Sequence, residues 1–474
     1  MKVALINPAA KGVKYSVEPM GLGYIAGYLE QNGIEVKIID QMAGDDVSKE
    51  ITIYHPDIAG ITSMTPMVMD AYGIADMCRR MKILTIMGGP HPSAMPEEAL
   101  GHADVVVVGE GELAMLDIIK KGISSGIISR PYLEDIDEIP LPSRRLMKQR
   151  FDLHTGNKLK MSMLAFLGSA LPLVKSASVL TSRGCPFRCI FCPNSLRQPP
   201  VRFHSAARVL EDIRRLKADY GVEVITFLDD NFLVNKPRLE EICRKMIEEK
   251  LKITWCCGAS AHFIDRKTVE MIREAGCRLV AFGVESGSQR ILNVLGKSTT
   301  VEQNKEAMKI CKEAGLLVHA SFMLGNPTET IEDVRLTQKF IRQTQPDVFY
   351  VNITTPYPGT KLWESYQERI PRPINWRGFK PSDSLDVYPC TTFSRVELGR
   401  LFFETMLVKP VVYSRDWKTA LRHPVESVNW LLRHPLTAAK IIAGRYVVGE
   451  NRKRGDKRSG DGMKTGRRIS PPGG

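Results

Sequence analysis

Two separate stretches of this 474-residue chain alternate short β-branched runs with helix-like segments, and this alternation limits the fold more than any other feature. In the first stretch the apolar runs lie at residues 3–6, 36–39, 58–61, 83–87 and 105–108. Strands and helices that alternate in this way form parallel α/β sheets. We therefore predict a doubly wound, Rossmann-like N-terminal domain over residues 1–135.

The second stretch predicts six more strands, at residues 178–181, 223–228, 253–257, 279–284, 317–323 and 348–353. The helix-like segments between them lie at residues 206–219, 237–249, 266–275, 301–314 and 331–344. Six strand–helix units indicate an open, partial (β/α)6 barrel whose active face lies at the carboxyl ends of the strands. We assign residues 136–170 to a linker and residues 171–395 to this barrel.

Three cysteines, Cys185, Cys189 and Cys192, follow the first strand of the barrel at the spacing C-x3-C-x2-C. Three thiolates at this spacing can bind three corners of a four-iron, four-sulfur cluster, and no fourth cysteine follows until Cys243. One iron would then remain open for chemistry. The alternative is a zinc knot with His204 as fourth ligand, although zinc sites usually pair two ligand hooks across a longer loop. A disulfide between two of these cysteines is less favoured than the zinc site.

Other polar or glycine-containing loops follow strands of the predicted barrel, and their candidate ligand-binding residues are Asp229, Asp230, Asn231, Glu285, Ser286 and Gly325. A carboxylate at Glu285 can pair with two ribose hydroxyls, and the loop at residues 229–231 can accept hydrogen bonds from an ammonium group. The acidic pair in that loop could instead cap the helix at 237–249, but it lies six residues too early. Independent loops on one face favour a cofactor site there.

The loops at the carboxyl ends of the first sheet lack bulk, so a flat or phosphate-bearing ligand can approach their backbone. Their candidate residues are Thr62, Ser63, Gly88, Gly89, His91, Gly109, Glu110 and Gly111. A dinucleotide is excluded, because the glycines of residues 21–27 have the wrong spacing and lie well beyond the first strand-to-helix turn.

Residues 18–30, 88–92 and 108–112 resemble the cobalamin-binding domain that precedes many radical S-adenosylmethionine enzymes. Many corrinoid domains carry Asp-x-His-x-x-Gly, whose histidine binds cobalt, and this domain lacks it. The nearest string, Asp152, His154 and Gly156, has its glycine one position early and lies past the domain. The resemblance therefore implies cobalamin with water or an apolar side chain below cobalt. His91 could hydrogen-bond the corrin amides, or it could be a solvated loop histidine.

Residues 178–360 are similar to the radical S-adenosylmethionine superfamily, and residues 282–288 are typical of its cobalamin-dependent branch. By that resemblance the three cysteines hold a 4Fe-4S cluster, and Glu285 matches the glutamate that binds the ribose of S-adenosylmethionine. The loop at 229–231 occupies the place of the family's Gly-Gly-Glu motif. Ser286 and Gly325 complete the set of expected S-adenosylmethionine contacts.

The resemblance implies a class B C-methyltransferase. A reduced cluster would cleave S-adenosylmethionine to a 5′-deoxyadenosyl radical, which takes hydrogen from an unactivated carbon of a small-molecule or lipid-like substrate. Methylcobalamin would then supply the methyl group, with no catalytic side chain beyond the cofactor ligands. A flavodoxin or ferredoxin would donate electrons. The alternatives are a cyclase or rearrangement enzyme that uses cobalamin as a redox partner, and a non-catalytic corrinoid-binding protein, which the cysteine triad and Glu285 disfavour.

The N-terminus has no charged region followed by a long apolar run, so no secretory signal is expected. The ten cysteines are then expected to be reduced thiols and metal ligands, and the protein is predicted to be cytoplasmic. Of the net charge of +13, the tail at 451–474 carries eight Lys and Arg against two Asp, and we expect it to be disordered. No nucleic-acid partner is expected. A repeated tetrapeptide at 421–424 and 432–435 predicts a helical region over 396–450, which either caps the barrel or docks on a membrane, and capping is favoured.

Overall fold

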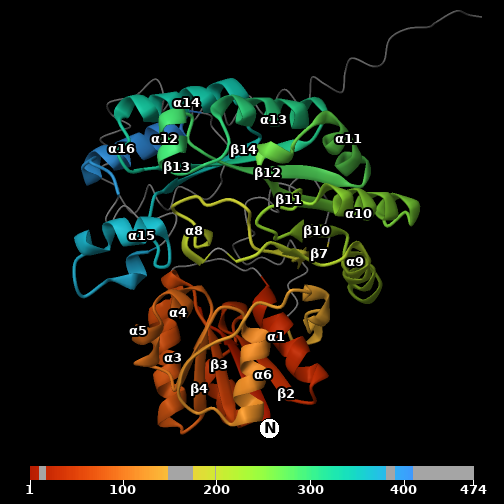
Figure 1. Ribbon diagram of the computed structural model, residues 1–474, viewed down its shortest axis with the longest axis vertical. Coiled ribbons are helices and arrows are strands. Elements are labelled where there is room, and N and C mark those ends of the chain that lie inside the picture. Colours follow the sequence, from red (N-terminus) through yellow and green to blue (C-terminus); the bar gives the residue numbers. More distant parts are fainter. Residues whose placement is uncertain (10–17, 148–174, 198, 380–389, 409–474) are drawn as a thin grey trace, which may run out of the picture. The chain divides into compact units, whose positions relative to one another are not determined.

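A computed structural model describes residues 1–9, 18–147, 175–197, 199–379 and 390–408 of the chain (Figure 1). It contains two six-stranded parallel sheets, one after the other along the chain, and a short two-stranded antiparallel ribbon. The α/β class predicted from the alternating pattern is therefore confirmed. Within the described residues, no helix is both long and apolar enough to cross a bilayer.

The first sheet has the strand order β2-β1-β3-β4-β5-β6. Its strands are β1 (Lys2–Asn7), β2 (Glu35–Asp40), β3 (Ile58–Thr62), β4 (Leu84–Gly88), β5 (Val105–Val108) and β6 (Gly126–Ser129). The order reverses between β1 and β3, and ligands of such sheets bind at the carboxyl ends of the strands at this switch point. The pattern did not predict β6, a four-residue edge strand with alternate residues exposed.

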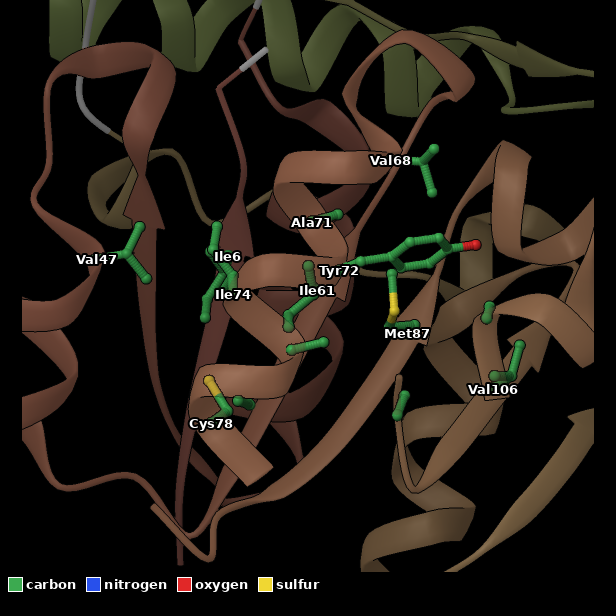
Figure 2. Close-up of a cluster of buried hydrophobic side chains, with 14 of the residues drawn as sticks. Ile6, Val47, Ile61, Val68, Ala71, Tyr72, Ile74, Cys78, Met87 and Val106 are labelled. Atoms are coloured by element: carbon green, nitrogen blue, oxygen red, sulfur yellow. The ribbon is translucent and has the colours of Figure 1, made fainter. Parts of the chain in front are cut away.

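Helices cover both faces of the first sheet, and each face has its own core. The helices are α1 (Met20–Gln31), α2 (Val47–Tyr54), α3 (Val68–Arg80), α4 (Pro90–Ala94), α5 (Pro96–Leu100) and α6 (Gly111–Lys121). Figure 2 shows one core, in which Ile6, Ile61 and Met87 of the sheet meet Tyr72 of α3. Trp363 and Trp376, from the end of the described chain, belong to the same cluster. The later part of the chain therefore completes a core of the first domain.

The second sheet has the order β14-β13-β12-β11-β10-β7, and its two outer strands each have one neighbour. Its strands are β7 (Ser176–Val179), β10 (Val224–Phe227), β11 (Thr254–Ala259), β12 (Cys277–Glu285), β13 (Leu317–Leu324) and β14 (Val348–Ile353). All neighbouring pairs are parallel, so the predicted open (β/α)6 sheet is confirmed.

Helices of the second sheet begin where a polar side chain accepts a hydrogen bond from the backbone of the first turn. They include α9 (Ala206–Tyr220), α10 (Lys236–Glu248), α11 (Arg266–Glu274), α13 (Val301–Glu313) and α14 (Ile331–Thr344), capped by Ser205, Asn235, Asp265, Thr300 and Thr330. The remaining helices described in this part of the chain are α8 (Asn194–Arg197), α12 (Gln289–Val294), α15 (Lys361–Tyr366) and α16 (Arg395–Met406). Side chains of the sequence thus fix the start of each long helix locally.

The described part of the predicted linker packs against both sheets. Arg144, in the turn η4 (Arg144–Leu146), is buried and lies 3.0 Å from Asp212 of α9 and 3.6 Å from Glu18. Of the predicted helical region at 396–450, α16 packs on α14, where the amide of Gln338 donates to Thr405. Residues 148–174, the repeat at 421–435 and the basic tail lie outside the described residues.

The packing predicts opposite effects for two glycine substitutions. Gly276 has φ of 104°, and a Cβ there would lie 2.2 Å from the carbonyl oxygen of Ile253, so Gly276→Ala should destabilise the second sheet by more than about 1 kcal/mol. Gly73 is exposed within α3 with open space around it, so Gly73→Ala should stabilise by about 0.5–1 kcal/mol. Thermal unfolding followed by circular dichroism should show a lower midpoint for the first variant only. Equal midpoints would contradict this packing.

Candidate active site

The three predicted cluster cysteines lie in a loop closed by the antiparallel ribbon of β8 (Ser182–Arg183) and β9 (Arg202–Phe203). Gly184 begins the loop with φ of 88°, and a Cβ there would lie 2.7 Å from the carbonyl oxygen of Pro200. Only glycine therefore allows the two limbs of this cysteine hairpin, defined as residues 182–203, to close so tightly. The loop also contains the short helix α8 (Asn194–Arg197).

The cysteine thiols are partly or fully buried, and burial raises the pKa of each of them. For Cys192 burial, with smaller contributions from the charges of Asp230 and of the other two cysteines, Cys185 and Cys189, raises the pKa to about 11. The nearby Lys297 acts in the opposite direction on Cys189. A bound metal would deprotonate such thiols, because the ion's charge is the largest in the site.

This set of ligands fits an iron–sulfur cluster better than zinc. Within the described ranges, no three His, Cys, Asp or Glu side chains converge on a point where one metal ion could sit. A cluster needs no such convergence, because each thiolate binds a different iron, whereas zinc takes its ligands at one centre. His204, the fourth ligand of the zinc alternative, instead lies 2.8 Å from Asp137 through Nδ1 and stacks on Tyr24. Zinc therefore has no support in the described residues.

Glu285 is the last residue of β12 rather than the first residue after it, and it lies at a bulge. The register with β13 shifts between Gly283 and Glu285, and Glu285 has φ of 67°, a left-handed conformation that is rare for residues other than glycine. Bulges of this kind redirect a side chain at a functional site. A Cβ on Gly283 would lie 2.5 Å from the Glu285 carboxylate, so the glycine leaves room for it.

The Glu285 carboxylate keeps acceptor capacity for a ligand. It is 9% exposed, and its one ion-pair partner within the described part of the chain is Lys297, 3.8 Å away. Burial raises its pKa, and the Lys297 ammonium acts against that rise. A buried carboxylate with a single distant cation can accept hydrogen bonds from two ribose hydroxyls.

The residues of the loop at 229–231 have two different roles. Asp229 is buried and accepts hydrogen bonds from the backbone and hydroxyl of Thr181 at 2.7 and 2.5 Å and from the hydroxyl of Ser182 at 2.6 Å. This carboxylate therefore holds the start of the cysteine hairpin, which differs from the ammonium contact expected from sequence. Asp230 is exposed and accepts one hydrogen bond, from Asn194 at 3.3 Å, and the buried Oδ1 atom of Asn231 has no hydrogen-bond partner among the described residues. Both side chains therefore keep acceptor capacity for a ligand.

Of the other two expected S-adenosylmethionine contacts, Ser286 is fully buried, and its hydroxyl lies 3.2 Å from that of Thr337 in α14. The backbone of Gly325 donates to Glu329 at 2.7 Å, and its φ of 79° turns the chain after β13. Ser286 therefore supports the loop from the helix side, whereas Gly325 shapes it.

A cavity of about 420 Å³ lies at the carboxyl ends of the first sheet. The predicted cobalamin residues that line it are Thr62, Gly88, Gly89, Gly109, Glu110 and Gly111. Leu180, Arg183 and Gly184 of the second domain line it as well, together with Asp230. One cavity therefore has walls from the glycine loops and from residues next to the cysteines.

The two other predicted cobalamin residues do not line this cavity. The hydroxyl of Ser63 donates to the carbonyl of Met64 at 3.1 Å. His91 is 1% exposed, lies 3.1 Å from the hydroxyl of Thr65 and packs edge-on against Trp376 with ring centroids 4.8 Å apart. His91 is thus neither a solvated loop histidine nor part of the cavity wall, because the aromatic cluster of the later chain covers it.

Two arginines of the cysteine hairpin bind two glutamates of the first domain, and we call these four residues the ionic clamp. Arg183 lies 2.6 Å from Glu112 and 3.1 Å from Oε2 of Glu110. Arg202 donates to both carboxylate oxygens of Glu110, to Oε2 at 3.1 Å and to Oε1 at 2.5 Å. Burial alone would raise the pKa of Glu110, but Arg202 and Arg183 outweigh it and hold the pKa below its usual value. The sequence alone did not predict the clamp. Its signal was present, because Glu110 and Glu112 lie at a glycine loop of the first sheet and Arg183 and Arg202 lie on either side of the cysteines.

Comparison with known proteins agrees with this geometry. The model of the radical SAM superfamily matches residues 179–341, and the B12 binding domain model matches residues 7–119. An uncharacterized methyltransferase from Pyrococcus horikoshii is 34% identical over 451 residues, which cover 88% of this chain and 94% of the relative. The chain belongs to the radical SAM superfamily.

The B12 binding domain over residues 7–119 places it in the branch that carries such a domain. The anaerobic magnesium-protoporphyrin IX monomethyl ester cyclase of Rubrivivax gelatinosus is 27% identical over 78% of this chain and 71% of its own. The solved structure of the cobalamin-dependent S-adenosylmethionine radical enzyme OxsB has the same fold, with a TM-score of 0.66, 17% identity and coverage of 95% and 75% of the two chains. The matched radical SAM and B12-binding domains imply a 4Fe-4S cluster, S-adenosylmethionine and cobalamin as the cofactors of this radical SAM enzyme.

The cysteine loop of this radical SAM protein makes a direct prediction. Changing Cys185, Cys189 or Cys192 to Ala should abolish binding of about four irons per chain in anaerobic reconstitution, because the cluster loses one of three anchors. Cys311→Ala is the matched control, because this buried thiol lies in α13 and should leave the iron content unchanged. Iron and sulfide analysis, with the absorbance of the cluster, measures both. Full iron content in a triple alanine variant would contradict the assignment.

The ionic clamp generates a second prediction. The double change Glu110→Gln and Glu112→Gln leaves two buried arginines without a carboxylate, which typically costs about 3–5 kcal/mol. We expect a lower unfolding midpoint and at least tenfold weaker cobalamin binding, measured by absorbance titration. Glu97→Gln, an exposed carboxylate of α5, should change neither quantity. Unchanged cobalamin affinity in a folded double variant would show that the clamp does not position the cavity.

Proposed function

We propose that this radical SAM protein is a C-methyltransferase that methylates an unactivated carbon of a small-molecule or lipid-like substrate. The observation that carries the proposal is the shared cavity, whose walls include both Gly89 of the glycine loops and Gly184 beside the cysteines. A methyl carrier and a hydrogen-abstracting group must act on the same carbon, so their sites must face one space. The methyltransferase relative supports the same reaction.

The residues of this chain would act by binding, orienting and excluding water. Cys185, Cys189 and Cys192 would hold the cluster through three irons, and Glu285 would bind ribose hydroxyls of S-adenosylmethionine. When bound, the cluster supplies an electron, S-adenosylmethionine supplies the hydrogen-abstracting group, and cobalamin supplies the methyl group. Leu180 and other aliphatic side chains of the wall keep water from the reacting carbon.

Glycine shapes the wall where cobalamin would lie. Gly89 has φ of 95°, and a Cβ there would lie 2.7 Å from the hydroxyl of Thr62. A Cβ on Gly111 would lie 2.5 Å from the side chain of Ile25. These loops can therefore pack this closely against Thr62 and Ile25 only because they carry no side chain at these positions, and this packing sets the wall beside which a flat ring would lie.

We infer a cytoplasmic location, where a flavodoxin or ferredoxin would supply the electron. All ten cysteines are free thiols, as expected in a reducing compartment. Membrane contact would depend on the C-terminal residues 409–474, which lie outside the described residues.

The released products test this function. Protein reconstituted with cluster and cobalamin, then given a strong reductant and S-adenosylmethionine, should release S-adenosylhomocysteine in an amount about equal to the bound cobalamin. Protein reconstituted without cobalamin is the control and should release none. Mass spectrometry measures S-adenosylhomocysteine and 5′-deoxyadenosine in each sample.

A reaction like that of the cyclase relative would give a different product. A cyclase that uses cobalamin as a redox partner would release 5′-deoxyadenosine and no S-adenosylhomocysteine. That outcome would overturn methyl transfer and favour ring formation. A protein that released neither product would be a corrinoid-binding protein without activity.

A further inference from the structure

The second sheet has one face covered by helices and one interior face. Phe322 of β13 lies edge-on to Phe340 of α14 and to Phe349 of β14, with ring centroids 5.9 Å and 6.3 Å apart, so Phe322 belongs to the face covered by helices. Alternate residues of a strand point to opposite faces. His319 and Ser321 of β13 therefore belong to the interior face.

The base of the interior face is apolar. Cys256 of β11 and Leu279 of β12 form a small buried cluster, against which Ala281 and Leu317 pack. His319 lies two residues beyond Leu317 on the same strand and pairs in register with Ala281. The imidazole thus lies next to this apolar cluster, which we call the apolar floor of the interior face.

The interior face opens toward the carboxyl ends of the strands. Ser321, Tyr350 and Asn352 are half-buried, whereas the helix-facing residues next to them are buried. Every interior position of β11 to β14, all of which lie in described ranges, is uncharged until Glu285 at the end of β12. A ligand that enters from the cofactor side would therefore pass the charged rim at Glu285 and then meet neutral polar groups.

His319 is a buried polar group whose ring nitrogens make no hydrogen bond to the described part of the chain. It is 8% exposed, and its ring lies against that of Tyr350 with centroids 5.1 Å apart. Burial lowers its pKa to about 4, so the ring is neutral near pH 7 and offers one donor and one acceptor. An unpaired buried polar group is destabilising, and a hydrogen bond to a ligand would remove that cost. An apolar residue would fill this position at lower cost if packing were its only role.

We propose that His319 binds the substrate, by a hydrogen bond to a neutral hydroxyl or carbonyl group of an otherwise apolar molecule that occupies the interior face. This inference rests on the proposed function and narrows its substrate class. A charged group would leave water for a face without a countercharge, which is strongly unfavourable. The part of the substrate that enters this face is therefore uncharged.

Three probes of equal size test the inference on the full chain reconstituted with cluster and cobalamin. They are 2-naphthol, naphthalene and 2-naphthoate, which differ in one neutral or charged group. The wild-type protein should bind 2-naphthol roughly three- to tenfold more tightly than naphthalene, as expected for one net hydrogen bond, and 2-naphthoate most weakly. Calorimetry or fluorescence titration measures the three affinities.

The variants assign the preference to one side chain. His319→Phe should remove the preference for 2-naphthol, and His319→Gln, which keeps a donor and an acceptor, should retain part of it. His102→Phe is the matched control, because this histidine pairs with Asp76 in the first domain and should leave the preference unchanged. Equal binding of 2-naphthol and naphthalene to the wild type, or a preference that survives in His319→Phe, would overturn the inference.

A measurement on the wild type covers the case in which the variants do not fold. Nitrogen NMR of protein labelled in its histidine rings should show one neutral imidazole shifted by 2-naphthol and not by naphthalene, and no shift with either probe would overturn the inference. Product analysis separates the two proposals. Release of S-adenosylhomocysteine without a 2-naphthol preference overturns only the role of His319, and the preference without that product overturns only methyl transfer.

Discussion

The ionic clamp is the interaction on which the arrangement of the active site depends. Arg183 and Arg202 leave the two limbs of the cysteine hairpin and meet on Glu110, while Glu112 binds Arg183 from the adjoining helix. Buried guanidinium groups need such partners, because an unpaired charge in a protein interior is strongly destabilising. The cysteine loop and the glycine loops are therefore held together by charge, and the cavity lies where they meet.

Backbone strain is concentrated at the carboxylate with the clearest ligand-binding role. Glu285 adopts a left-handed conformation at a strand bulge, and Gly283 before it provides the space for its carboxylate. A residue held in such a conformation costs about 1–3 kcal/mol, so the surrounding sheet must enforce it. The ordinary packing of β12 thus supports an unfavourable geometry at its end.

Charge is distributed unevenly between the rim and the interior of the second sheet. Glu285, Lys297 and Asp230 lie near the carboxyl ends of the strands, whereas the interior face below them is neutral and ends in an apolar floor. Polar cofactors with charged groups suit the rim, and an uncharged molecule suits the interior. The same sheet can therefore bind both and keep the substrate carbon close to the cofactors.

The sequence by itself determined the two sheets and predicted the cysteine ligands, because β-branched runs, helix caps and ligand spacing act over short distances along the chain. It placed Glu285 one residue beyond its strand and missed β6, where the pattern is short. Only the tertiary structure decided which groups meet. Arg183 and Glu112 are 71 residues apart, His91 is covered by Trp376 from the end of the described chain, and Asp229 is occupied by Thr181 and Ser182. Such contacts depend on strand register and on packing between distant segments, which no local pattern of residues encodes.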